Sequence, residues 1–491
     1  MTKTVNILLI PADNRPVSYS LPIFIGEQNR NVKVIVPPVK LLGGLDFSAD
    51  ISGILSWLEE AISQERPDFI ICALDTVAYG GLISSRRCDD TKNTILARLE
   101  QFKELVKKAG AKVFGFTSIM RISNNNVNEE EKEYWDKYGV LIFKYSFLSH
   151  KTKADKATDA ERHALKETEA QIPAHILEDY LNTRQKNFRI NKMYIDWSKE
   201  GVIDFLIYGK DDTSTFGINI QEAEQLQSLI EKADMRNFVR IQTGSDEVCS
   251  LLTARAIQEA FDKRIKIFPV YSTEHGCSVI PLYEDMPLSE SVKRQLNTCN
   301  AELAASEDTA DMVLLLHSPV EKQNDFIFPN PDIPPNLQGA NFCVDFIKNS
   351  GKPVILADVL NANGSDPILA EKLLSESGIL DKLYGYAGWN TASNTIGTAL
   401  SAGISRYIAE KTSCFDVDVF KKLMFIRFAD DWAYQSTARR RIREITPLAD
   451  EKLLYSELLP VIEPLAKKLN INTEEITLKF PWNRTFEVEI R

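Results

Sequence analysis

The chain has 491 residues, and its 58 Lys and Arg against 69 Asp and Glu give a formal net charge of −11. This acidic balance excludes nucleic acid as the main partner, because a phosphate backbone requires a concentrated basic surface. No apolar run approaches the roughly 20 residues of a membrane span, and seven scattered cysteines favour reduced thiols, so we expect a cytoplasmic protein without a membrane partner.

Short runs rich in Val, Ile, Leu and Phe alternate along the chain with longer amphipathic segments. Several runs are almost continuously apolar, which is typical of parallel strands covered on both faces. The predicted strands are residues 6–10, 32–36, 69–74, 112–117, 205–208, 239–242, 265–270, 312–316, 354–357 and 384–387. A further apolar run, residues 426–429, is expected to lead into Asp430 and Asp431 in the same way.

Helices are predicted where apolar residues recur at a spacing of 3.6. This pattern covers residues 51–62, 95–106 and 396–408, and the second helix is expected to end before Gly110. Asn219 and Glu222 have the spacing of a capping box that would open another helix. Residues 477–490 are expected to form an extended run, and the basic run at 439–443 a solvated helix face.

The alternation of strands and helices predicts an α/β fold with mostly parallel sheets. We favour several Rossmann-like units with a helical insert and a central cleft; the alternative is a β/α barrel over about 5–318 with a C-terminal α/β addition. Both place functional loops at the carboxyl ends of strands. The expected segments are an α/β unit at 1–149, the helical insert at 150–200, a second α/β unit at 201–310, a third at 311–412, and C-terminal helices with a final strand at 413–491.

The residues that follow the predicted strands are mostly carboxylates, carboxamides, arginines and glycines. Carboxylates and amides pair with hydroxyl groups, and arginine offers a planar fork to an anionic substituent. These loops therefore suit a polyhydroxylated ligand, and two carboxyl groups in one pocket would suit acid and base or nucleophile roles. The candidate catalytic residues are Asp75, Asp211, Asp212, Asp246 and Glu247. The candidate substrate-binding residues are Asp13, Asn14, Arg15, Tyr79, Arg121, Glu274, His275, Asn363, Asp366, Trp389, Asn390 and Asn394.

Several of these positions also have a purely structural interpretation. Asp246 and Thr391 could cap the helices that follow them, and Asp13 and Asp358 could form Asx-turns. Trp389 could pack in the core instead of stacking on a sugar ring. Both interpretations stay open for each of these residues.

Familiar metal and cofactor motifs are missing from the sequence. The oxygen-rich loop at 358–366 lacks EF-hand spacing, and five scattered histidines form no zinc motif, so no metal site is predicted. The chain has no Gly-x-Gly-x-x-Gly turn, no P-loop and no Gly-x-Ser-x-Gly elbow. We therefore expect no cofactor, and we disfavour dinucleotide oxidoreduction, P-loop hydrolysis and α/β-hydrolase chemistry.

Six strand-end motifs occur together in this chain. They are Pro-Ala-Asp-Asn-Arg-Pro at 11–16, Asp-x-x-x-Tyr-Gly-Gly at 75–81, Lys-Asp-Asp at 210–212, Gly-Ser-Asp-Glu at 244–247, Asp-x-x-Asn-x-Asn-Gly-x-Asp at 358–366 and Gly-Trp-Asn-Thr-x-x-Asn at 388–394. With a further match at 173–187, the sequence resembles an uncharacterised bacterial family, domain of unknown function 4127. The resemblance implies one full-length architecture, and it implies that Arg184 and Asn187 reach the site, with Arg184 among the candidate substrate-binding residues.

The leading hypothesis is a hydrolase that acts on a small-molecule carbohydrate, above all a glycoside hydrolase that uses paired carboxylates. One alternative is a metal-assisted phosphoester or amide hydrolase, in which the Asp and Asn loops supply oxygen ligands. The other alternative is a non-catalytic intracellular sugar-binding protein. All three require strand-end side chains to converge, and all three leave the oligomeric state open.

Overall fold

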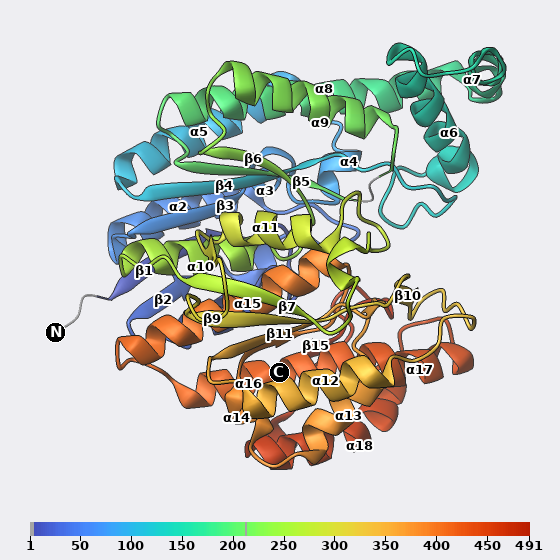
Figure 1. The fold of residues 1–491 in the computed structure, drawn as a ribbon. Helices are drawn as coiled ribbons and strands as arrows, with labels where there is room; N and C mark the ends of the chain where they lie inside the picture. Colours follow the sequence, from blue (N-terminus) through green and yellow to red (C-terminus); the bar gives the residue numbers. More distant parts are fainter. Residues whose placement is uncertain (1–3, 212–213) are drawn as a thin grey trace. The chain divides into compact units, whose positions relative to one another are not determined.

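The computed structural model describes residues 4–211 and 214–491. Its strands form two main sheets (Figure 1), which confirms the predicted α/β class. The six-stranded sheet has the order β2-β1-β3-β4-β5-β6, and the five-stranded sheet has the order β13-β11-β9-β7-β8. The described strands thus form open, Rossmann-like sheets, and the alternative of a single closed β/α barrel is wrong.

The chain divides into two compact units. Unit 1 comprises Met1–Ile7, Arg15–Ile35 and Asp246–Arg491, and unit 2 comprises Leu8–Asn14 and Val36–Ser245. Strand β1 (Val5–Ile10) contributes residues to both. Within the described ranges, no helix combines the length and the apolar character that a membrane crossing requires.

Unit 2 is built on four parallel strands, β3 to β6. Helices α8 and α9 pack together along one face of these strands (Figure 1). The elements of the unit are η1 (Val39–Leu41), α2 (Ile51–Glu65), β3 (Phe69–Ala73), α3 (Leu74–Tyr79), α4 (Ser84–Arg87), α5 (Lys92–Ala109), β4 (Lys112–Ile119), α6 (Trp135–Lys153), α7 (Asp159–Gln171), α8 (Ala174–Lys199), β5 (Phe205–Lys210), α9 (Ile218–Lys232) and β6 (Val239–Thr243).

Unit 1 contains the five-stranded sheet and most of the helices that cover it. Its elements up to β12 are α1 (Ser20–Glu27), β2 (Val32–Ile35), α10 (Val248–Ala260), β7 (Lys266–Tyr271), η2 (Gly276–Ser278), α11 (Leu288–Thr298), β8 (Glu302–Leu303), β9 (Met312–His317), β10 (Asn324–Asp325), α12 (Leu337–Asn349), β11 (Val354–Asp358) and β12 (Asn361–Ala362). They continue with α13 (Pro367–Ser375), α14 (Ile379–Lys382), β13 (Leu383–Ala387), α15 (Ala392–Lys411), α16 (Val417–Arg427), the π-helical segment η3 (Phe428–Ala438), α17 (Arg439–Ile445), α18 (Glu451–Leu469), η4 (Thr473–Glu475), β14 (Leu478–Lys479) and β15 (Glu489–Ile490).

Alternate residues of β11 show why its sequence is apolar throughout. Leu356 packs into the cluster that contains residues of α12 and α13, whereas Ile355 faces Gly403 of α15 on the opposite side of the sheet. A parallel strand with helices on both faces buries every side chain, so its apolar run is continuous rather than alternating. All ten predicted strands are confirmed, with ends within two residues of those expected.

Three of the predicted helices are also confirmed, as α2, α5 and α15. The predicted C-cap of α5 is confirmed as well, since Gly110 has a φ of +64°, a conformation that glycine adopts without strain.

The predicted capping box at Asn219 and Glu222 is wrong. Helix α9 already begins at Ile218, and its first N–H groups are capped from helix α6. The Gly217 N–H donates to His150 Nδ1 at 3.2 Å, and the Ile218 N–H donates to the Ser146 hydroxyl at 2.7 Å. A tertiary cap therefore replaces the local one.

The C-terminal part of the chain differs from the prediction at two places. Asp430 and Asp431 lie in η3, which continues α16 as a helix, so they do not follow a strand. Residues 477–490 are not one extended run, because only the short antiparallel strands β14 and β15 lie at its ends.

The basic run at 439–443 is only partly a solvated face. Arg440, Arg441 and Arg443 are exposed, but Arg439 is buried. Its guanidinium donates to Gln435 Oε1 at 3.1 Å and lies 4.9 Å from the centre of the Phe486 ring.

The approach of α15 to the sheet of unit 1 depends on Gly385 in β13. A Cβ atom there would lie 2.4 Å from the Ala399 carbonyl oxygen and 2.8 Å from the Gly403 nitrogen. We expect Gly385→Ala to lower the free energy of unfolding by about 1–3 kcal/mol, because neither backbone atom can move away cheaply. Gly351→Ala is the control, since nothing lies within 4 Å of its added atom. Urea unfolding of both variants checks this, and equal midpoints would contradict it.

Candidate functional site

Three neighbouring strands of unit 2 are each followed by a polar residue that the sequence analysis named as a candidate site residue. Asp75 follows β3, Arg121 follows β4 and Asp211 follows β5. Because these strands are parallel and adjacent, their carboxyl ends meet at one edge of the sheet. Arg121 Nη1 lies 3.6 Å from Asp211 Oδ2, so two of the three are in direct contact.

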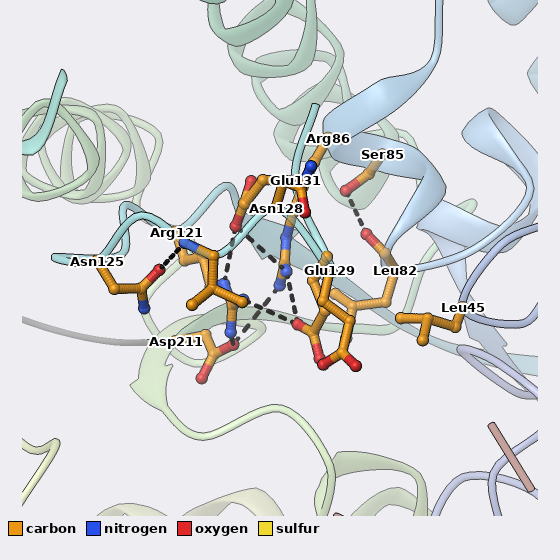
Figure 2. A network of polar contacts seen from close by, with 12 residues as sticks. Leu45, Leu82, Ser85, Arg86, Arg121, Asn125, Asn128, Glu129, Glu131 and Asp211 are labelled. Atoms are coloured by element: carbon orange, nitrogen blue, oxygen red, sulfur yellow. Dashed lines mark hydrogen bonds and ion pairs between the residues drawn. The ribbon is translucent and has the colours of Figure 1, made fainter. Parts of the chain in front are cut away.

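An ion-pair network surrounds Arg121 (Figure 2). We call it the arginine network: Arg86, Arg121, Glu130, Glu131 and Asp211. Arg86 lies 3.0 Å from Glu130 and 3.6 Å from Asp211, and Arg121 lies 2.8 Å from Glu130 and 3.1 Å from Glu131. The Arg86 side chain is 2% exposed, whereas that of Asp211 is 33% exposed. Asp211 is thus the carboxylate of this network that is most open to a ligand.

The two glutamates of the network lie on a segment without regular structure, between β4 and α6. Arg87 holds this segment, because its side chain donates to the carbonyl oxygens of Glu131 at 2.9 Å and Asn128 at 3.2 Å. Neither Glu130 nor Glu131 follows a strand directly, which is why the strand-end pattern missed them.

The two residues singled out by the family resemblance contact the backbone of this site. Arg184 forms a buried ion pair with Glu222 and lies 3.4 Å from the carbonyl oxygen of Arg121. Asn187 donates to the carbonyl oxygen of Ser85 at 2.8 Å, directly before Arg86. Arg184 and Asn187 therefore support the segments that carry the two arginines of the network.

Asp75 is buried beside the arginine network. Its Oδ1 accepts from the Thr117 hydroxyl at 2.7 Å, and its Oδ2 accepts from the N–H and the hydroxyl of Ser118 at 2.8 and 2.6 Å. Burial raises the pKa of Asp75, and these hydrogen bonds together with the charge of Arg86 offset the effect only in part. Asp75 therefore holds a proton more readily than an exposed aspartate does.

The turn after Asp75 contains Tyr79, Gly80 and Gly81. Both glycines have positive φ, +91° and +136°, which explains the Gly-Gly pair at this point of the sequence. Tyr79 is buried, and its hydroxyl makes no hydrogen bond within the described residues.

Tyr79 also lines a cavity of about 370 Å³ in unit 2. Phe47, Ser48, Ser84 and Arg87 form other parts of its wall. The hydroxyls of Ser48 and Ser84 lie 3.0 Å apart, and Phe47 is 56% exposed. The cavity thus offers a ligand hydroxyl groups, a guanidinium group and one face of an aromatic ring.

Unit 1 brings three further predicted residues together. Arg15 lies 2.7 Å from Asp246, and Asn390 donates to the same carboxylate at 3.0 Å. The Arg15 guanidinium also lies 3.6 Å from Glu487 and 4.5 Å from the centre of the Trp482 ring. Asp246 therefore does not cap α10, whose N-cap residue is Glu247.

Two more predicted residues, Asn363 and Asp366, lie in the loop after β11. The Asn363 N–H donates to the Asn390 carbonyl at 3.0 Å, and its side chain donates to Asp325 at 3.0 Å. Asp366 caps α13 and lies 3.0 Å from His317. Asp358 accepts from the Leu360 N–H at 3.3 Å, which confirms the Asx-turn interpretation for this residue.

Other predicted residues lie away from these contacts. Glu274 and His275 are exposed on the loop after β7. Trp389 is buried in a core cluster and packs 5.7 Å from the Phe486 ring. Thr391 caps α15, and Asn394 lies in the first turn of that helix, where its N–H faces the Thr391 hydroxyl at 3.5 Å.

Two further predicted residues, Asp13 and Asn14, lie in unit 2, and a third is outside the described residues. Asp13 is buried, and the Asn14 N–H donates to the Gly43 carbonyl at 3.1 Å. Asp212 lies outside the described residues. Within the ranges that the structure describes, no group of three or more His, Cys, Asp or Glu is arranged to hold a metal ion.

The fold and these strand ends define an α/β protein with polar groups gathered at the carboxyl edges of parallel sheets. The chain belongs to the family described as "Protein of unknown function (DUF4127)", whose model matches residues 7–491. No curated protein matches it.

The chain has weak likenesses to several solved structures, of which three are as follows. An ABC transporter solute-binding protein from Clostridium phytofermentas with bound L-rhamnose is 10% identical over 85% of this chain and 84% of its own, with a TM-score of 0.18. Fpglu1 from Fervidobacterium pennivoraus is 12% identical over 85% and 96%, with a TM-score of 0.19. Anabaena Alr3699/HepE in complex with UDP and glucose is 10% identical over 86% and 98%, with a TM-score of 0.13. At these TM-scores none of them bears on ligand or mechanism.

Glu247, a predicted catalytic residue, is fully buried between helices of unit 1. Its Oε1 accepts from Gln295 at 3.0 Å, its Oε2 has no partner within the described residues, and its side chain packs against Gly397. Burial raises the pKa of Glu247 to about 8.

This pKa predicts a pH-dependent stability. The folded chain keeps a proton on Glu247 between roughly pH 4.5 and 8 that the unfolded chain releases, so the stability from this group falls as the pH rises through that window. We expect Glu247→Gln to remove a slope of at most about 1.4 kcal/mol per pH unit. Urea unfolding at pH 5.5, 6.5 and 7.5 measures it, with the exposed Glu321→Gln as the control. Parallel slopes for wild type and Glu247→Gln would refute the prediction.

Proposed function

We propose that this chain is a hydrolase that cleaves a glycosidic bond, with Asp75 as the proton donor and Asp211 as the base or nucleophile. One observation carries the proposal: Asp75 and Asp211 have opposite environments and share Arg86. The Arg86 charge acts on Asp75, and its Nη2 lies 3.6 Å from Asp211. Two carboxyl groups, one in a buried and one in a more exposed environment, are the parts that glycoside hydrolysis requires.

The two roles follow from the surroundings of each carboxyl group. Asp75 is buried and has a raised pKa, so it suits the group that gives a proton to the leaving oxygen. Asp211 is more exposed and is paired with two arginines, so it suits the group that attacks or that activates water.

The cavity beside Tyr79 supports a carbohydrate as the substrate. Its volume of about 370 Å³ falls within the range of small-molecule sites. Burial and the charge of Asp75 raise the pKa of Tyr79, a residue of the cavity wall, which supports Asp75 as the acid that acts beside this cavity. A sugar ring would find the Phe47 face for its apolar side and the Ser48 and Ser84 hydroxyls for its polar edge.

A second candidate function, sugar binding without catalysis, is favoured by one specific observation. Both oxygens of Asp75 already accept hydrogen bonds from Thr117 and Ser118. A carboxyl group whose two oxygens are both hydrogen-bonded can have a structural role in a binding site as well as a role in proton transfer. Both candidate functions require the chain to bind a sugar, but only the hydrolase also cleaves it.

We expect a screen of chromogenic glycosides, including acidic and N-acetylated sugars, to find turnover by the wild-type chain. Asp75→Asn and Asp211→Asn should each lower kcat by about 100-fold or more, because each removes a proton-transfer or attacking group. Asp155→Asn is the control, since this aspartate is 92% exposed and its left-handed backbone accepts asparagine. Circular dichroism melting shows that each variant is folded.

The outcomes separate the two candidates. If no glycoside is cleaved while calorimetry detects binding of a sugar, the binding function replaces the hydrolase. If neither turnover nor binding is found across the sugars, both candidates fail. If Asp211→Asn cleaves as fast as Asp155→Asn, the assigned roles are wrong.

A further inference from the structure

Unit 1 has its own polar edge, at the carboxyl ends of β7, β9 and β11. These strands are adjacent in the five-stranded sheet and run parallel. Ser272 follows β7, His317 is the last residue of β9, and Asp366 lies in the loop that leaves β11. None of these three side chains belongs to the site proposed for glycoside cleavage.

The three side chains form a continuous hydrogen-bonded series, which we call the serine relay: Ser272, His317 and Asp366. Ser272 Oγ lies 3.2 Å from His317 Nδ1, and His317 Nε2 lies 3.0 Å from Asp366 Oδ2. With the proton of a neutral imidazole on Nε2, the Nδ1 lone pair faces the serine hydroxyl. A hydroxyl, an imidazole base and a carboxylate in this order are the parts of a serine nucleophile.

Neighbouring groups fix the far end of the relay. Asp366 Oδ1 accepts from the Ile368 N–H at 3.1 Å as the N-cap of α13, and the Asp366 N–H donates to Asp358 Oδ2 at 2.7 Å. His317 is fully buried, so its ring cannot turn without losing the hydrogen bonds to Ser272 and Asp366. The imidazole is therefore held in one orientation toward Ser272.

The near end of the relay is less buried than His317. Ser272 is half-buried, and its Oγ also receives the Ser318 N–H at 2.9 Å. The loop that begins at Ser272 packs tightly on Ser318, since a Cβ atom at Gly276 would lie 2.2 Å from the Ser318 hydroxyl. Core groups hold one side of the His317 ring, and its Nδ1 lies against the Ser272 hydroxyl, which is at the sheet edge.

We infer that Ser272 is the nucleophile of a second active site, one that hydrolyses an ester, with His317 as its base and Asp366 as the residue that positions the base. In the first step Ser272 Oγ bonds to the ester carbonyl carbon and its proton passes to His317 Nδ1. The bond from that carbon to the alcohol oxygen breaks, and the alcohol leaves with the proton from His317. Water then attacks the acyl group, releases the carboxylic acid and restores the Ser272 hydroxyl.

The charges around His317 set the pH at which the relay works. Burial opposes a positive charge on the ring, but Cys343 of α12, Asp366 before α13 and Asp358 of β11 outweigh burial and raise the pKa of His317 well above its usual value. The ring accepts the Ser272 proton only in its neutral form. Reactivity at Ser272 therefore rises with pH.

A fluorophosphonate probe tests the inference on the full chain. Ser272 Oγ would bond to phosphorus, the P–F bond would break, and fluoride would leave as the proton passes to His317. Peptide mapping by mass spectrometry should find the adduct on Ser272, with a yield that increases between pH 6 and 9. Ser272→Ala should abolish it, and His317→Gln should slow it by about tenfold or more. Ser278→Ala, an exposed serine of the same loop, should leave it unchanged.

A second variant keeps the test decisive if His317→Gln does not fold. In Ser272→Cys the new thiol would face the imidazolium, which stabilises a thiolate. We expect iodoacetamide to alkylate position 272 at least tenfold faster than Cys277 of the same loop at pH 7. Equal alkylation of the two thiols, or equal probe labelling of Ser272 and Ser278, would overturn the inference whether or not glycosides are cleaved.

Discussion

A carboxyl group that leaves water must keep its proton or find a cation, and both solutions occur at the strand ends of this chain. Asp211 and Asp246 are held by arginines: the first by Arg86 and Arg121, the second by Arg15. Asp75 and Glu247 are buried with raised pKa values. The choice between the two solutions decides what each residue can do. An ion-paired carboxylate can bind or attack, whereas a buried carboxyl group with a raised pKa is better suited to donate a proton. In unit 2 the charge of Arg86 acts on one residue of each kind, Asp75 and Asp211.

The strands could be predicted from the sequence because the sheets are parallel and covered on both faces. Continuous burial leaves a continuous apolar run, as Ile355 and Leu356 show by packing against helices on opposite sides of one strand. The errors arose where a distant element decides the local structure. Helix α9 takes its cap from Ser146 and His150 of α6, more than sixty residues earlier, so the local motif at Asn219 was left without that role. Likewise, Asp430 lies in η3, which continues helix α16. The local sequence before Asp430 does not distinguish this helix from a strand.

The candidate site could be predicted only where its residues follow strands directly. Asp75, Arg121 and Asp211 were found in this way because parallel neighbours deliver their carboxyl ends to one edge. Glu130 and Glu131 were missed, since they lie on an irregular segment whose path is fixed by Arg87 and not by any periodic pattern. His317 was missed for the opposite reason: it is the last residue of a buried strand, where a histidine is indistinguishable in sequence from a core residue. Burial, rather than composition, gives these residues their chemistry.

The two candidate sites differ in how they generate reactivity, and that difference follows from their charge balance. In unit 2, two arginines face three carboxylates in the arginine network, and Asp75 lies buried beside them with a raised pKa. In unit 1, the charges of Asp358 and Asp366 act on the His317 imidazole and raise its pKa. The serine is activated only when this imidazole is neutral. The first arrangement suits protonation of a leaving oxygen, and the second suits attack on a carbonyl carbon.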